Sequence, residues 1–157
     1  EIYTASETLQ PVPIIDKIEQ QNNTGFSGND IQIKVFFTDD ASRNDFYLFY
    51  FKLSDKIIPK YGVINDEFFQ GNQIFGVYYD ENLKSGQHLD MSIDGISLRY
   101  YNYMNILLSI AGTDSGSPFQ SPPATVRGNI INTTNENNFA LGYFNLSEID
   151  FRNYVVE

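Results

Sequence analysis

The sequence predicts a mainly β protein: an antiparallel β-sandwich-like domain of about seven strands with one α-helix packed against it. Apolar residues recur at every second position in several short stretches, as they do in strands with one buried face. The 157 residues include 13 Phe and 11 Tyr, and aromatic side chains are enriched in strands. One segment instead carries apolar residues at helical intervals, which predicts the helix.

Five strands are expected in the first two thirds of the chain. Ile31, Ile33, Val35 and Phe37 alternate along the first of them. The second is almost continuously apolar, which is typical of a central strand covered on both faces. Turn-forming residues separate the later strands at the spacing of an antiparallel meander. The expected ranges are 31–37, 46–53, 57–64, 73–79 and 88–96.

Residues 97–111 are expected to form the helix, because apolar residues recur there at spacings of three and four. Ser97 is a suitable N-cap, and Gly112 is a suitable residue just beyond the C-terminus. We expect this helix to close one face or one end of the sheets.

Three further segments are interpreted from composition and pattern. Residues 20–25, Gln-Gln-Asn-Asn-Thr-Gly, have little to bury and are expected to form a loop. Residues 113–138 are rich in Gly, Ser, Pro, Asn and Thr, which predicts an ordered belt around the core or a partly mobile segment. Apolar residues alternate from Phe139 to Tyr143 and return from Phe151 to Val155, which predicts one long strand or a bent pair.

Prolines mark an expected domain boundary near the start of the chain. The first ten residues alternate like a short strand, and Pro11-Val12-Pro13 then stiffens the backbone and removes two hydrogen-bond donors. We expect residues 1–13 to be the last strand and proline linker of a truncated upstream domain, and residues 14–157 to form the β-sandwich domain. Without an initiator Met or a signal peptide, the natural N-terminus is expected to lie further upstream.

Composition excludes several classes of function. The 10 basic and 20 acidic residues give a formal net charge of -10, which repels phosphates, so no nucleic acid partner is expected. The chain has no cysteine, and it therefore forms no disulfide, thiolate metal site or cysteine nucleophile. No apolar run approaches the roughly 18 residues of a membrane helix.

Carboxylates are the only candidates for a metal site or for a catalytic acid pair. Asp39, Asp40 and Asp45 cluster between two expected strands and carry the hard oxygen ligands that calcium prefers. Their spacing matches no EF-hand loop, and a solvated hairpin turn is the favoured alternative. Asp90 and Asp94 share a parity on one expected strand and are candidates for the two acids of glycoside hydrolysis. A chance match is the favoured alternative there too, and no cofactor is expected.

No catalytic residue is expected. His88 is the single histidine and lacks the companions that a metal site or a Ser-His-Asp triad requires. No serine lies in a Gly-x-Ser-x-Gly elbow. His88 is interpreted as an exposed residue at a strand end, and the protein is expected not to be an enzyme.

Tyrosines are the favoured candidates for a binding surface, because they give contact area at low entropic cost. A proline-rich loop between Asp114 and Asn129 beside them would present a rigid surface. The alternative is that most of the tyrosines line the core. The candidate ligand or partner surface consists of Tyr78, Tyr79, Tyr100, Tyr103, Phe119, Pro122 and Pro123.

Several motifs together resemble one family. Pro118–Ile130 reads Pro-Phe-Gln-Ser-Pro-Pro-Ala-Thr-Val-Arg-Gly-Asn-Ile, and Ala140–Phe144 reads Ala-Leu-Gly-Tyr-Phe. Upstream, Tyr3-Thr4-Ala5-Ser6 precedes the proline segment, and a hydrophobic strand with an acidic turn follows it. In order and spacing these motifs resemble the C-terminal half of the Bacteroidota domain-of-unknown-function family numbered 4249.

The resemblance implies a two-domain, lipid-anchored outer-membrane protein, commonly encoded beside a TonB-dependent transporter and lying at the cell surface or the periplasmic face. It implies membrane contact only through a lipid anchor that is absent from this chain. The expected function is a non-enzymatic accessory or docking module, with the transporter as partner. The alternatives are an extracellular glycan- or peptide-binding or adhesion module and, less favoured, a glycan-active hydrolase with a cleft and shifted carboxylates.

Overall fold

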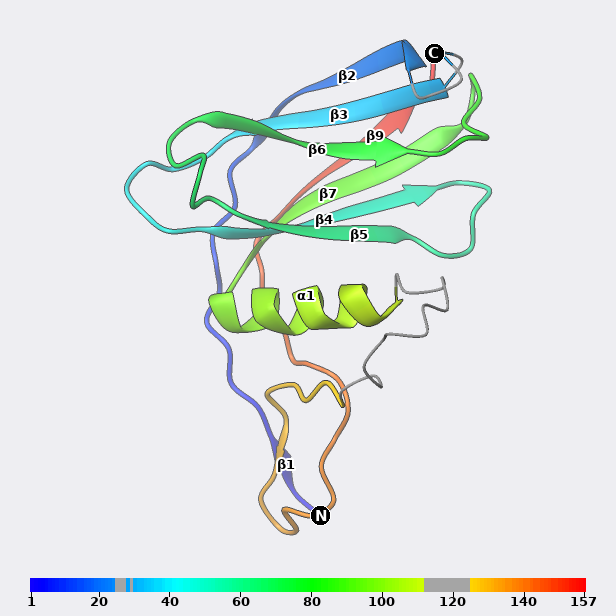
Figure 1. Cartoon of the computed structure of the whole chain (residues 1–157). Helices are drawn as coiled ribbons and strands as arrows, with labels where there is room; N and C mark the ends of the chain where they lie inside the picture. The colour runs from blue at the N-terminus through cyan, green and yellow to red at the C-terminus, as the bar shows by residue number, and fades with distance from the viewer. Residues whose placement is uncertain (25–27, 29, 112–124) are drawn as a thin grey trace, which may run out of the picture.

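The computed structural model describes residues 1–24, 28, 30–111 and 125–157. Over these residues the chain forms nine strands and one helix, most of which lie in one body with a narrower extension below it (Figure 1). In chain order the elements are β1 (Tyr3–Thr4), β2 (Ile15–Thr24), β3 (Asp30–Thr38), β4 (Phe46–Leu53), β5 (Lys60–Asn65), β6 (Gln73–Tyr79), β7 (His88–Ile96), α1 (Leu98–Ala111), β8 (Ile131–Asn132) and β9 (Ile149–Val155).

Two antiparallel sheets face each other and form the sandwich. One has the strand order β2-β3-β6, and the other has the order β5-β4-β7-β9. The expected antiparallel β-sandwich with one packed helix is confirmed for the described residues. The expected meander order is wrong, because the chain changes sheets after β3, β5 and β6 instead of continuing beside the preceding strand.

The core lies between the two sheets. Alternation along β3 turns Ile33, Val35 and Phe37 inward, where each is almost fully buried. The Phe37 ring packs edge-on against Tyr47 of β4, with centroids 4.9 Å apart. The buried cluster comprises Ile15, Ile33, Val35, Phe37, Tyr47, Phe49, Phe51, Leu53, Ile74, Tyr78, Leu83, Leu89, Met91, Ile93 and Val156.

Helix α1 covers the outer face of the four-stranded sheet (Figure 1). Its buried Met104 packs with Leu48 of β4 and Ile96 of β7. Ser97 caps the helix, since its Oγ accepts a hydrogen bond from the Tyr100 backbone N–H at 3.2 Å. The expected helix and N-cap are confirmed. β4 is almost continuously apolar for the predicted reason: the helix covers one face of this strand, and the other sheet covers the opposite face.

The narrower extension brings distant parts of the chain together. β1 pairs antiparallel with β8. Asn129 is 2% exposed, and its Nδ2 donates to the carbonyls of Ser6 at 3.2 Å and Phe144 at 2.8 Å. Its Oδ1 accepts a hydrogen bond from the Phe144 backbone N–H at 2.8 Å. One buried amide therefore joins three segments of the extension.

Residues around the proline segment lie against the main sandwich. The Glu148 N–H donates to the Gln10 carbonyl at 2.9 Å. A Cβ on Gly95 would lie only 2.0 Å from the Pro11 carbonyl oxygen, so only glycine allows this close approach. Val12 packs against the core cluster. The domain boundary at residue 13 stays a prediction.

Three sequence expectations differ from the observed elements. The loop expected at 20–25 is wrong for its described residues, because Gln20 to Thr24 belong to β2, where pairing with β3 outweighs their polar character. The strand expected at 139–143 is reduced to a single bridge at Gly142, whose positive φ of 105° interrupts an extended run. The strand expected from Ile57 begins at Lys60, directly after Pro59.

Candidate functional site

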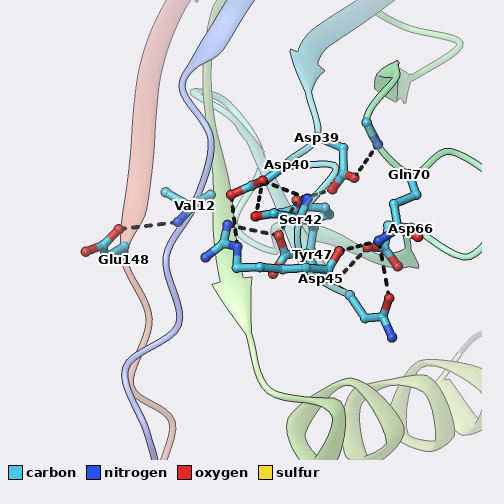
Figure 2. Close-up of polar contacts among 12 residues, drawn as sticks. Val12, Asp39, Asp40, Ser42, Asp45, Tyr47, Asp66, Gln70 and Glu148 are labelled. Atoms are coloured by element: carbon cyan, nitrogen blue, oxygen red, sulfur yellow. Dashed lines mark hydrogen bonds and ion pairs between the residues drawn. The ribbon is translucent and has the colours of Figure 1, made fainter.

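Three buried aspartates lie at one end of the sandwich, and we name Asp39, Asp45 and Asp66 the acidic end (Figure 2). Asp39 follows β3 in one sheet and Asp66 follows β5 in the other, at two points where the chain crosses between the sheets. The Tyr47 hydroxyl donates to Asp39 Oδ1 at 2.5 Å, and the Gly71 N–H donates to its Oδ2 at 2.9 Å. Each oxygen of Asp39 therefore already has a protein donor.

The other two aspartates are engaged in the same way. Asp66 Oδ2 accepts the backbone N–H of Asp45 at 2.7 Å, and the Arg43 guanidinium lies 2.9 Å from Asp45 Oδ2. Burial raises the pKa of Asp45, against the opposing effect of Arg43. Asp40 lies outside this buried group and pairs with Ser42 and Arg43. These contacts describe a network that fixes the loops at this end of the sandwich.

Metal ligands are not grouped at the acidic end. In the described ranges, no three His, Asp or Glu side chains are placed so that they could hold a metal ion. Arg43 supplies the positive charge beside Asp45. Calcium binding by Asp39, Asp40 and Asp45 stays a prediction.

Asp90 and Asp94 lie on the outer face of β7 but have different surroundings. Four residues along a strand separate their Cα atoms by roughly 13 Å, which exceeds the separation of paired acids in glycosidases. Asp90 accepts a hydrogen bond from Asn153 at 2.6 Å. Asp94 accepts one from Ser92 at 2.7 Å, and burial raises its pKa. This strand does not assemble an acid pair. His88 is exposed at the start of β7, as expected.

Tyr100 and Tyr103 on α1 form a cluster with Tyr143. The ring centroids of Tyr100 and Tyr143 are 4.8 Å apart, and those of Tyr103 and Tyr143 are 5.2 Å apart. The Tyr143 hydroxyl donates to Glu7 Oε2 at 2.5 Å, and burial and this bond raise its pKa to about 12. The cluster joins the helix to the C-terminal segment. The other expected site residues, Phe119, Pro122 and Pro123, lie outside the described residues.

Tyr78 and Tyr79 point to opposite faces of β6. Tyr78 is 2% exposed, its ring packs on Phe51, and burial raises its pKa to about 12. Tyr79 is 38% exposed and donates its hydroxyl to Asp30 at 2.9 Å. The two rings therefore lie on opposite faces of β6, although both residues line the cleft at its edge.

Tyr79 belongs to an apolar patch on the outer face of the three-stranded sheet, and we name Phe36, Phe75, Val77 and Tyr79 the aromatic face. Phe36 and Phe75 are direct cross-strand partners with ring centroids 5.2 Å apart. The Lys17 Nζ lies 4.5 Å from the Phe36 centroid, and the Lys34 Nζ lies 5.0 Å from that of Phe75. The aromatic face is thus an apolar surface on which two lysines lie over the rings, and Glu19 pairs with Lys17 at 2.6 Å.

Tyr78 contributes to a cleft of about 390 Å³ between β5 and β6, and we name this cleft the edge slot. Its other lining residues are Phe49, Phe51, Lys60, Tyr61, Gly62, Val63, Ile64, Gly76, Val77 and Tyr79.

Sequence reasoning missed the edge slot and Asp66. Gly62 and Gly76 interrupt two strands rich in β-formers, and glycine inside a strand is a recognised sign of close approach to the backbone. That signal was present in the sequence. Asp66 carried no signal, because only the pairing of β4 with β5 brings it to Asp45.

The fold and surfaces define a small antiparallel β-sandwich module that has a helix on one sheet and an open edge. The chain belongs to the family described as a domain of unknown function, DUF4249, whose family model matches residues 1–151. No curated protein and no solved structure is similar enough to the chain to count as a match. Among the described residues, no helix has both the length and the apolar character needed to cross a membrane.

Proposed function

We propose that this chain is a non-enzymatic module of a lipid-anchored outer-membrane protein, in a bacterium of the Bacteroidota, that docks on a TonB-dependent transporter and assists nutrient uptake. The observation that carries the docking proposal is the aromatic face. Phe75 is 45% exposed, Val77 40% and Tyr79 38%, and adjoining apolar side chains of this kind mark interaction surfaces.

The chemistry of the aromatic face favours a protein partner. Lys17 and Lys34 lie over its rings in a chain whose formal net charge is -10. A partner surface with apolar side chains would match this arrangement, because aromatic residues are enriched in protein interfaces. The module needs no cofactor for this role. Family membership supports the transporter as the partner, because the family resemblance implies a gene encoded beside one.

The test is co-purification of the tagged full-length protein from its native outer membrane in gentle detergent, followed by mass spectrometry. We expect a TonB-dependent transporter in near-equal amount with the wild-type protein. Phe75→Ser should lose it, whereas Leu141→Ser, equally apolar and 72% exposed but remote from the sheet, should retain it. Recovery of the bait alone would contradict the proposal and would favour glycan binding on the same rings.

A further inference from the structure

One strand position of the sandwich is unfilled in the described chain. Four strands, β5-β4-β7-β9, face only three, β2-β3-β6. β2 lies over β9, where the Ile15 N–H donates to Asp150 at 2.6 Å. β6 lies over β4, because a Cβ on Gly76 would meet the Phe49 ring at 2.5 Å. The position opposite β5 is therefore the one without a strand.

The inner surface at this position has the shape of a side-chain pocket. Gly62 pairs with Phe49 and Gly76 pairs with Val35, so both glycines face the interior of the sandwich. A Cβ on Gly62 would meet nothing within 4 Å. The rings of Phe49, Phe51 and Tyr78 line the same slot. The Phe49 ring already covers Gly76, so an apolar side chain that enters over Gly62 would lie against aromatic carbon.

The main chain at the slot lacks a strand partner on its outer side. β5 and β6 are both edge strands in the described part of the chain, and an edge strand presents N–H and C=O groups that another strand can pair with. The Tyr79 carbonyl at this edge accepts a hydrogen bond from Lys60 Nζ at 2.5 Å. The Lys60 side chain thus donates to a backbone carbonyl that could otherwise accept a hydrogen bond from a neighbouring strand.

We propose that the edge slot binds an extended polypeptide segment of a partner protein, which pairs with β6 as a fourth strand and inserts one apolar side chain over Gly62, beside the Phe49 ring. Backbone pairing with an edge strand and a pocket for an alternate side chain together define recognition by strand addition. The charges at the slot balance, because Lys56 and Lys60 face Asp80 and Glu81. The slot therefore selects by apolar fit. This inference is independent of the proposed transporter.

The test uses the isotope-labelled full chain and a synthetic peptide, acetyl-Thr-Val-Thr-Phe-Thr-Val-Thr-amide, followed by nuclear magnetic resonance titration. We expect shift changes at Gly62, Gly76 and the amides of β6, with slower hydrogen exchange along β6. Gly62→Val places its Cβ where no atom lies within 4 Å, takes up space in the slot and should weaken binding about tenfold or more. Its melting temperature should be at least that of the wild type, because valine suits a strand better than glycine.

Two controls distinguish strand addition from peptide adhesion elsewhere on the surface. The same peptide with methylated backbone nitrogens along one edge should not bind, because it cannot pair with β6. Phe75→Ser alters the outer face of the same strand and should bind the unmethylated peptide normally, although it should lose the transporter. Equal binding by Gly62→Val, shift changes confined to another surface, or no change at β6 at millimolar peptide would each overturn the proposal.

Discussion

The hydroxyl of Tyr47 donates a 2.5 Å hydrogen bond to Asp39 at a point where both side chains are buried. Tyr47 belongs to β4 in one sheet, and Asp39 directly follows β3 in the other. Burial, and next the bond to Asp39, raise the pKa of the tyrosine. The bond therefore joins the two sheets at the acidic end and keeps the phenol protonated.

Tyr47→Phe should lower the free energy of unfolding by about 1–3 kcal/mol, because Asp39 would keep its burial but lose a donor. Urea denaturation monitored by circular dichroism measures this change. Tyr61→Phe is the matched control, since the Tyr61 ring is 44% exposed, and it should change stability little. An equal loss in both variants would mean that the bond contributes nothing specific.

Asp94→Asn should stabilise the protein at neutral pH and not in acid. Burial, opposed by the Ser92 hydroxyl, raises the pKa of Asp94 in the folded protein above its ordinary value of 3.8. The folded state then binds the Asp94 proton more tightly than the unfolded state does. The free energy of unfolding therefore falls as pH rises from 3.8 to the raised pKa. The variant should gain free energy of unfolding on the order of 1.4 kcal/mol for each pH unit that separates the raised pKa from 3.8.

Urea denaturation between pH 3 and pH 7 checks this prediction against Asp16→Asn, which should behave oppositely. Hydrogen bonds from Gln73 and Thr38 lower the pKa of Asp16. The stability that Asp16 contributes is thus present above its ordinary pKa of 3.8 and is lost as pH falls through the lowered value. Asp16→Asn should therefore destabilise at neutral pH. The same pH trend in both variants would contradict the assignment.

Alanine at the two glycines of the edge slot should have opposite effects on stability. Gly76→Ala places a methyl group 2.5 Å from the Phe49 ring, and overpacking of this kind costs about 1–3 kcal/mol. Gly62→Ala meets no atom within 4 Å and should gain about 0.5–1 kcal/mol from a less flexible unfolded chain. Thermal melts of the two variants give the comparison, and a gain for both would show that Phe49 moves aside freely.

Lys60→Ala should expose the β6 edge and promote self-association. Lys60 donates to the Tyr79 carbonyl at 2.5 Å, and its Nζ lies 4.9 Å from the Tyr78 ring centroid. Lysines on edge strands discourage pairing between copies. Sedimentation velocity should detect dimers of Lys60→Ala at concentrations where the wild type is monomeric. Lys52→Ala, on a central strand, is the control, and dimers of that variant would point to a general loss of charge.

Local patterns predicted most of the elements, and long-range pairing accounts for most of the errors. Helix α1 was predictable because its cap residue Ser97 and its apolar spacing are both local. β2 was not, because Gln20 to Thr24 are polar and become a strand only through their pairing with β3. The tyrosine pair at 78 and 79 was recognised, but a period of two sends the two rings to different surfaces.

The edge slot illustrates a second limit of sequence reasoning. Its position depends on how many strands each sheet contains, and this number follows from which sheet the chain joins after β3 and β5. No residue near Gly62 encodes that choice. The acidic end likewise could not be predicted from local sequence, because Asp66 lies beside Asp45 only through the register of β4 and β5.

The two sides of the sandwich differ in how their strands are joined, and this asymmetry favours one side for the addition of a strand. On the side of β2 and β9, the Gln20 side chain donates to the Glu157 carbonyl at 2.8 Å and accepts from the Glu157 N–H at 2.9 Å. The unpaired edges of β5 and β6 lie together on the other side. Within the described residues, β5 and β6 therefore offer the side where one incoming strand, or one copy of the molecule across a two-fold axis, meets the fewest existing bonds between the sheets.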